Sequence, residues 1–325
     1  MPPKLVVYGD LAVDLFVQVD AMPGVGQDAI AHHLAFLPAG SAANCAVTAA
    51  RLGATVEFVG LTGHDHLTPI LLEDLRASHV RYGHLRQVEG PTAVIVAVVD
   101  KQGERTFYSY RGVSSWTAYG PLPPDLLAPG DWLHLSGYSF QDEYSQTTAL
   151  AFIAQAKARN AHVTLDPSFH FAREFRTRYA PLLPELDFIF PNREEAYLMS
   201  GVTDPEQAAA TIRALGAKTV VIKLGSQGCL IASTEGNRYV PAYPATYVVD
   251  TTGAGDAFCG GFLTGQLWGL EYGASTKIGH SAAVCVIGQL GGHVGAPTLP
   301  QLLAQLTANG DAALAAVLRS LPLAV

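Results

Sequence analysis

VDTTGAGDAFCGGF, residues 249–262, is the stretch of this 325-residue chain that says most about its fold and chemistry. It is typical of a tight loop with few side chains that runs directly into a helix of small residues. Glycines let backbone N–H groups approach an anion, and a helix N-terminus adds about half a positive charge. Asp256, held there, can act as a general base toward a hydroxyl. A base beside an anion site suits phosphoryl transfer, although a bare GxGD is equally consistent with a glycine turn and an N-capping Asp.

Short apolar runs alternate with helical patterns along most of the chain. Residues 5–10 and 55–60 have the pattern of strands, and residues 41–52 between them have that of a helix ending at Gly53. Strand, helix and strand in this order indicate a βαβ unit and a parallel sheet. Strand-like runs return three times further on, at residues 163–166, 188–190 and 220–223.

Two stretches break this rhythm because no helix separates their strands. One is residues 15–37, and the other is a hairpin over 92–110 with its turn at Lys101-Gln102-Gly103. We expect them to form a small second sheet that stands off the main domain as a lid. The predicted division is a large α/β domain at residues 1–14, 38–90 and 112–325 and a β-sheet lid at residues 15–37 and 91–111.

Composition narrows the class of protein. Hydrophobic residues make up 49% of the chain and the net charge is −8, which argues against nucleic acid as a partner. No apolar run has the ~20 residues of a membrane span, and the N-terminus lacks a signal-peptide pattern. The four cysteines lie far apart without a CxxC pair, as expected for free thiols. We therefore expect a cytoplasmic globular protein.

Two motifs together carry a family resemblance. DTTGAGDAFCGGFL, residues 250–263, resembles along its whole length the C-terminal signature of the PfkB/ribokinase family of carbohydrate kinases. AGSAANCA, residues 39–46, with Gly53 and Gly63 after it, resembles the N-terminal signature. The resemblance implies an α/β fold: a ribokinase-like three-layer α/β/α domain with a mostly parallel central sheet, plus a small β-sheet lid.

The resemblance also implies roles for residues around the phosphates of ATP. Asp256 matches the catalytic base, and the backbone amides of Gly253, Ala254 and Gly255 match the anion hole. The NxxE motif of the family organises Mg²⁺ and its waters, and it matches Asn192 and Glu195. The nucleotide loop and the adenine pocket match Lys223, Gly225, Gly228 and His280.

Substrate and monovalent-cation positions follow in the same way. Positions that hydrogen-bond sugar hydroxyls match Asp14, Gly40, Ser41 and Asn44. The ligands of a potassium ion match Asp250 and Thr252, with the backbone carbonyls of Ile287, Leu290 and Gly292 completing the cage. The last ligand position of the family corresponds to Ala296, which has no side-chain oxygen, so activation by K⁺ is left open.

Departures from the ribokinase pattern bear on the substrate. Ser41 stands where ribokinase has a ribose-contacting lysine, and HLSG at residues 134–137 replaces a run with a substrate-contacting Glu. Ribose is therefore not assumed; HLSG also resembles fructokinase-like and ketodeoxygluconate-kinase-like members. Arg111 suits a carboxylate or phosphate on the substrate, or a solvent-facing position.

These features predict an ATP-dependent kinase acting on a primary alcohol of a sugar or sugar derivative. A nucleoside kinase of the same family is the alternative, with Phe107, Tyr108 and Tyr110 as candidates to stack on a base. A non-catalytic sugar-binding regulator on the same fold is the second alternative. A dinucleotide-binding oxidoreductase is discarded, because GDLAVD after the first strand carries a single glycine. The particular sugar, its reacting hydroxyl and a homodimer through the lid stay open.

Overall fold

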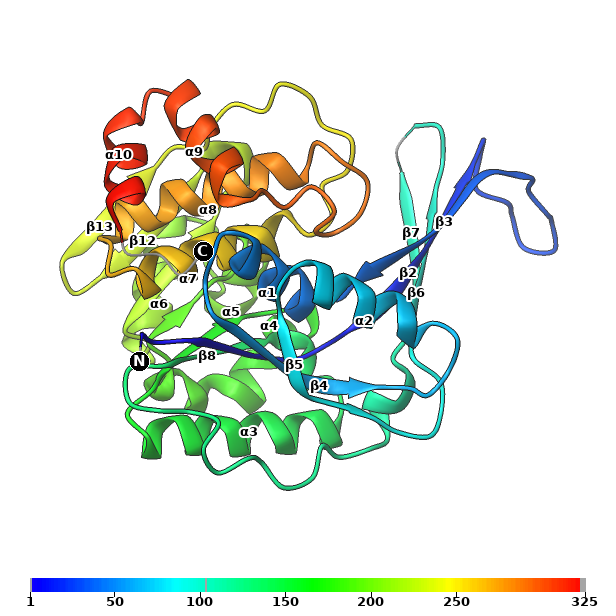
Figure 1. The fold of residues 1–325 in the computed structure, drawn as a ribbon, viewed down its shortest axis with the longest axis horizontal. Coiled ribbons are helices and arrows are strands. Elements are labelled where there is room, and N and C mark those ends of the chain that lie inside the picture. Colours follow the sequence, from blue (N-terminus) through cyan, green and yellow to red (C-terminus); the bar gives the residue numbers. More distant parts are fainter. Residues whose placement is uncertain (1, 103, 322–325) are drawn as a thin grey trace.

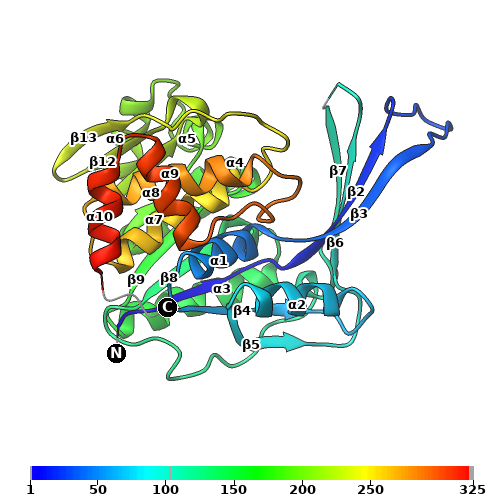
Figure 2. The same cartoon turned by 45° about the horizontal axis from the view of Figure 1, so that its top comes forward.

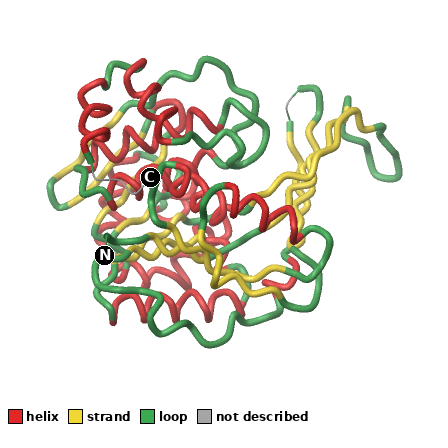
Figure 3. Tube along the Cα trace, viewed as in Figure 1, coloured by secondary structure: helices red, strands yellow, loops and turns green. Residues whose placement is uncertain are grey.

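The computed structural model describes residues 2–102 and 104–321, so Gly103 of the expected hairpin turn lies outside the described residues. Two separate sheets form, and they are distinct in Figures 1 and 3. The nine-stranded sheet has the order β13-β12-β11-β10-β9-β8-β1-β4-β5 and is parallel except at β12 and β13. Its strands are β1 (Leu5–Tyr8), β4 (Val56–Thr62), β5 (Arg81–Gln87), β8 (Trp132–Ser136), β9 (His162–Asp166), β10 (Phe188–Ile189), β11 (Thr219–Lys223), β12 (Cys229–Ser233) and β13 (Gly236–Val240).

Helices cover both faces of this sheet, which confirms the predicted three layers (Figure 2). One face packs on α3 (Glu143–Ala158), α4 (Phe169–Glu174), α5 (Arg193–Ser200) and α6 (Pro205–Ala214). The other packs on α1 (Ser41–Arg51), α2 (Thr68–Ala77) and α7 (Ala254–Leu267). Outside α7 lie α8 (Tyr272–Val286), α9 (Leu299–Ala308) and α10 (Ala312–Ser320). No helix in the described part of the chain is long and apolar enough to cross a bilayer.

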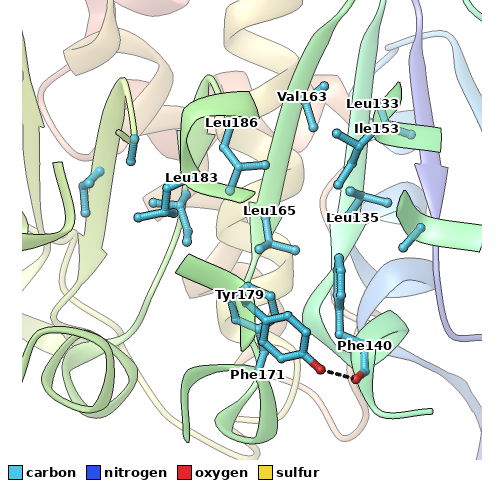
Figure 4. Packing of buried hydrophobic residues seen from close by; sticks show 14 of the residues in the cluster. Leu133, Leu135, Phe140, Ile153, Val163, Leu165, Phe171, Tyr179, Leu183 and Leu186 are labelled. Atoms are coloured by element: carbon cyan, nitrogen blue, oxygen red, sulfur yellow. Dashed lines mark hydrogen bonds between the residues drawn. The ribbon is translucent and has the colours of Figure 1, made fainter. Parts of the chain in front are cut away.

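The alternation of side chains in β1 explains why both faces are covered. Val6 and Tyr8 point into the core under α3–α6, while Leu5 and Val7 point into the core under α1, α2 and α7. A parallel strand buried on both faces is continuously apolar, as this one is. Figure 4 shows the first core, in which the Tyr179 hydroxyl donates to the carbonyl of Phe140 at 2.8 Å.

The second sheet consists of the two stretches that lack helices, as predicted. Its order is β3-β2-β6-β7, and it stands off the large domain in Figure 1. The strands are β2 (Ala12–Val19), β3 (Ala31–Ala39), β6 (Ala93–Val99) and β7 (Arg105–Tyr110). We call this four-stranded sheet the lid sheet. It begins at Ala12 and β3 continues to Ala39, so both strands run past the expected limits of 15 and 37.

Register separates the lid sheet into two faces. Phe36, Leu15, Val96 and Tyr108 are directly paired across the four strands, so their side chains share one face, which we call the outer face. Residues one position along in each strand share the opposite face. This inner face carries Asp14, Phe16, Ala97, Arg105 and Phe107, which together line a small cavity against residues 250, 252 and 291.

Candidate active site

Asp256 is the third residue of α7, and side chains from α1 hold its carboxylate. Ser41 Oγ donates to Oδ1 and Asn44 Nδ2 donates to Oδ2, both at 2.7 Å. Burial and the nearby Asp166 carboxylate raise the pKa of Asp256 to about 7, although these two hydrogen bonds lower it. Ser41 and Asn44, expected to bind sugar hydroxyls, therefore contact the predicted base in this structure.

The loop before α7 presents free backbone donors. Within the described residues the N–H groups of Gly253, Gly255 and Asp256 make no hydrogen bond, whereas that of Ala254 donates to Thr251 O at 3.3 Å. Gly253 caps the helix with φ +73°, and a Cβ there would lie 1.9 Å from Gly292 O. Only glycine fits, because a side chain would collide with that carbonyl. Three unpaired N–H groups at a helix start can bind an anion.

Beneath this loop lies an ion pair between Lys223, which the nucleotide-loop motif indicated, and Asp166, which no motif indicated. Lys223 Nζ is 2.6 and 2.7 Å from the two oxygens of Asp166, and it would be 3.0 Å from a Cβ on Gly255. Burial alone lowers the pKa of Lys223, but Asp166 raises it well above its ordinary value. Asp166 was missed, although a carboxylate that ends a parallel strand is a signal for a site.

Asn192 and Glu195 form a reciprocal cap on α5. Asn192 Oδ1 accepts from Glu195 N–H at 2.9 Å, and Glu195 Oε2 accepts from Asn192 N–H at 2.8 Å. Burial raises the pKa of Glu195, while the charge of Lys223 opposes the rise. Across residues 2–102 and 104–321, no group of three or more His, Cys, Asp or Glu side chains forms a metal cage.

A cavity of about 580 Å³ opens beside the loop. Four of the five residues predicted to bind the cofactor line it, namely Lys223, Gly225, Gly228 and His280, whereas Asn192 is not among its lining residues. Ala254 and Gly255 of the loop border it as well, and much of the remaining lining is apolar, including Val248 and Phe258. Burial lowers the pKa of His280 to about 4, which keeps the ring neutral. The cavity has the size and character of a nucleoside site.

Asp14 lies on the inner face of the lid sheet. It is buried, and Oδ1 has no hydrogen-bond partner within the described residues. Burial, with smaller contributions from Asp250 and Asp10, raises the pKa of Asp14 to about 7. An unpaired buried oxygen is a group that a substrate hydroxyl would satisfy.

Asp10 and Gly40 shape the start of α1. The Asp10 carboxylate accepts from the N–H groups of Ser41 at 2.7 Å and Ala42 at 3.3 Å. Gly40 has φ +114°, and a Cβ there would lie 2.5 Å from Asp10 O. Sequence reasoning missed Asp10 as a site residue, although it lies two residues after the end of β1. Its place in the structure is to fix the helix that carries Ser41 and Asn44.

The residues expected to hold potassium have other partners. Asp250 Oδ1 lies 2.8 Å from Arg105 Nη1 of the lid and also accepts from Thr252 N–H, while Oδ2 accepts from Gly291 N–H. Thr252 Oγ1 accepts from Arg105 Nη1 at 3.1 Å. Burial raises the pKa of Asp250, but these hydrogen bonds and the Arg105 charge hold it below its ordinary value.

Two of the three backbone carbonyls that were expected to complete the potassium site also have other partners. Ile287 O accepts from the N–H groups of Val249 and Asp250, Gly292 O lies against Gly253, and Ala296 offers no side-chain oxygen. Of the three expected carbonyl ligands, only that of Leu290 is left without another partner among the described residues. The oxygen ligands as arranged here therefore do not fit a monovalent cation. No step of the reaction is therefore assigned to K⁺.

Three further side chains near the site need to be placed: His134 and Arg111, which the sequence analysis considered, and His293, which it did not. His134 is buried against Thr164 Oγ1 at 2.9 Å, and burial lowers its pKa to about 3, so it is a core residue. Arg111 lies over the Tyr138 ring and lines a small cavity with Asp10. His293, which no motif indicated, has Nδ1 2.7 Å from Asn44 Oδ1. It thereby orients the amide that holds Asp256.

A buried carboxylate beside free backbone N–H groups, between a nucleoside-sized cavity and the four-stranded sheet, is an arrangement that suits a kinase of small hydroxylated molecules. Comparison with known proteins agrees. Residues 2–299 match the model of the pfkB family of carbohydrate kinases, and the chain belongs to this family. It is 31% identical to a fructokinase of Klebsiella pneumoniae over 274 residues, 82% of this chain and 85% of that one.

Solved structures share the fold over nearly the whole chain. A ribokinase of Thermotoga maritima superposes with a TM-score of 0.83 and 26% identity, covering 94% of this chain and 99% of that chain. A ribokinase of Arabidopsis thaliana complexed with ribose and ATP gives a TM-score of 0.81 and 25% identity, with the same coverage. The protein is thus a carbohydrate kinase with a ribokinase fold, as the two signatures predicted.

Proposed function

We propose that this enzyme transfers the γ-phosphoryl group of ATP to a primary alcohol of a sugar or sugar derivative. The observation that carries the proposal is the Asp256 carboxylate, held by Ser41 and Asn44 beside free N–H groups at the start of α7. Asp256 takes the proton from the attacking hydroxyl. The N–H groups of the 253–255 loop, of which those of Gly253 and Gly255 are free in this structure, stabilise the charge on the transferring phosphoryl group.

ATP fits the cavity of about 580 Å³, with its base near His280 and its phosphates toward Gly255. Lys223 lies close beneath the loop, so its charge adds to the electrostatic attraction for the phosphates. Mg²⁺ keeps several waters when it binds with phosphates and needs one or two carboxylates from the protein. Glu195 Oε1, the oxygen not used in the cap, suits that position, with Asn192 fixing the side chain. The ion would neutralise phosphate charge there.

The sugar occupies the space between Asp14 and Asp256. Asp14 Oδ1 has no partner among the described residues, and it accepts hydrogen bonds from sugar hydroxyls. Gly40 keeps the backbone close at this point. Residues 15–37 and 91–111, extended by the start of β2 and the end of β3, act as the lid that excludes water and protects ATP from hydrolysis.

A nucleoside is the second candidate substrate, because Phe107 lines the same cavity as Asp14. An aromatic ring on the inner face can stack on a base. Tyr108 and Tyr110 do not add to this case, since register places them on the outer face, away from Asp14.

The outer face supports a further part of the proposal, a homodimer through the lid sheet. Phe36 and Tyr108 lie on this face and are 49% and 64% exposed. A second copy is the partner that would cover them.

The test is ATP consumption across pentoses, hexoses, keto-acid sugars and nucleosides, with Asp256→Asn as the matched blank. Wild type should consume ATP with one class of sugar and form a phosphate ester that the variant does not form. A nucleoside as the best substrate would select the second candidate. Binding of a sugar without turnover would indicate a non-catalytic regulator and contradict the proposal.

A further inference from the structure

Arg105 is the first residue of β7, and its side chain crosses from the inner face of the lid sheet to the anion loop. Nη1 lies 2.8 Å from Asp250 Oδ1 and donates to Thr252 Oγ1 at 3.1 Å. The Arg105 side chain is 25% exposed and that of Asp250 is 8% exposed. This contact is therefore a largely buried ion pair between the lid and the residues that precede Gly253.

Asp250 ties together the two segments that flank the anion hole. Its Oδ1 accepts from Thr252 N–H at 2.8 Å and its Oδ2 accepts from Gly291 N–H at 3.0 Å. The neighbouring Gly292 carbonyl lies against Gly253. A buried carboxylate needs a compensating positive charge, and more so where phosphates bind close by. Among the described side chains, Arg105 is the cation paired with Asp250.

We propose that Arg105 takes the place of a monovalent cation in this enzyme and that it is a positioning residue of the anion hole. Its guanidinium neutralises Asp250 and at the same time links the lid sheet to the loop over residues 250–253. Lid position and anion-hole geometry are thereby coupled through one side chain. The inference rests on the proposed kinase function, and it predicts equal activity in Na⁺ and K⁺.

The experiment compares wild type, Arg105→Ala, Arg105→Lys and Lys101→Ala as full-length chains. Lys101 is an exposed cation near the tip of the same hairpin, so its removal changes the net charge equally. Rates are measured with the best sugar and ATP at fixed ionic strength in NaCl, KCl and methylguanidinium chloride. We expect wild type and Lys101→Ala to be indifferent to the salt. Arg105→Ala should lose roughly 10- to 100-fold in kcat, with methylguanidinium restoring part and Arg105→Lys retaining part.

A second readout does not depend on turnover. Amide hydrogen exchange over residues 249–256, without substrates, should be faster in Arg105→Ala than in wild type or Lys101→Ala, and methylguanidinium should slow it again. Activation of wild type by K⁺, or unchanged exchange in Arg105→Ala, would overturn the inference. If exchange responds as expected while wild type phosphorylates nothing, the inference stands and the proposed function fails.

Discussion

At the scale of single residues, the pKa of Asp256 is set by two opposing effects of its surroundings. Burial and Asp166 raise its pKa to about 7, while Ser41 and Asn44 stabilise the ionised form. The ionised form is the one that accepts a proton. We therefore expect kcat/KM for the sugar to rise about tenfold per pH unit below pH 7 and to level off above it. A wild-type profile that is flat from pH 5.5 to 8 would contradict this role.

A substitution tests the same role of Asp256. Asp256→Asn should lower kcat by roughly 10²–10⁴ and bind sugar nearly normally.

Asp14 allows a separate prediction. Asp14→Asn should lower kcat/KM for the sugar by roughly 10- to 1000-fold, because buried hydroxyls lose about 1–3 kcal/mol each when poorly paired. The affinity for ATP should barely change, since its cavity is formed by other elements. Equal losses for sugar and ATP would indicate a folding defect instead, and no loss would place the sugar elsewhere.

The stability of the same variant depends on pH in a defined direction. The pKa of Asp14 in the folded protein, about 7, lies above the ordinary value of 3.8. Folding therefore favours the protonated carboxyl, and this stabilisation is complete below pH 4 and is lost as the pH rises through 7. Asp14→Asn should raise Tm at pH 8 relative to wild type and leave it nearly unchanged at pH 4. Thermal unfolding at the two pH values checks this, and a lower Tm at pH 8 would contradict it.

The sequence could predict those site residues whose partners lie close to them along the chain. Asp256, Gly253 and Gly255 sit in one contiguous motif, and their helix-start geometry follows from it. Arg105 and Thr252 are 147 residues apart, and Asn44 and His293 are 249 apart. Such contacts arise from the way the sheets and helices pack. No spacing or periodicity within a segment indicates them.

At the scale of elements, the turn into α7 depends on Gly253. Gly253→Ala adds a Cβ that would lie only 1.9 Å from Gly292 O. The loop must move to relieve this clash, and the free N–H groups move with it. Gly269→Ala is the matched control, because its φ of +74° is similar and nothing lies within 4 Å of its Cβ. We expect roughly 10²-fold or greater loss of kcat for the first variant, as for a lost oxyanion donor, and near-wild-type kcat for the control. Equal activities would remove the anion hole from the proposal.

Most elements were predictable because their signals are local. Small residues followed by Gly53 predict α1, and apolar runs predict β1, β9 and β11. The limits of the lid strands were less accurate. The segment from Ala12 to Val19 contains no Gly or Pro to end a strand, so the chain passes from β1 into the second sheet within a few residues. Asp14 thus lies in a lid strand, beyond the point where the chain leaves the large sheet.

At the scale of the whole molecule, the two faces of the lid sheet carry different side chains. The inner face carries Asp14 and Arg105 toward the site, and the outer face carries the paired row of Phe36, Leu15, Val96 and Tyr108. The order β3-β2-β6-β7 also leaves β3 and β7 as edge strands. Exposed apolar side chains on a sheet with open edges favour association with another sheet. This arrangement is the physical basis of the proposed homodimer.

Phe36→Ser tests that arrangement. It removes an exposed apolar side chain from the β3 edge of the outer face and leaves the inner face, which carries Asp14, unchanged. Tyr239→Ser is the control, because Tyr239 is 52% exposed on β13, at the far edge of the large sheet. Light scattering across a range of protein concentrations should show a dimer for wild type and Tyr239→Ser and a shift toward monomer for Phe36→Ser. If the dimer supports lid closure, kcat/KM for the sugar should fall as the Phe36→Ser protein is diluted. A monomeric wild type at all concentrations, or a dimer that Phe36→Ser leaves intact, would show that the outer face meets no second copy.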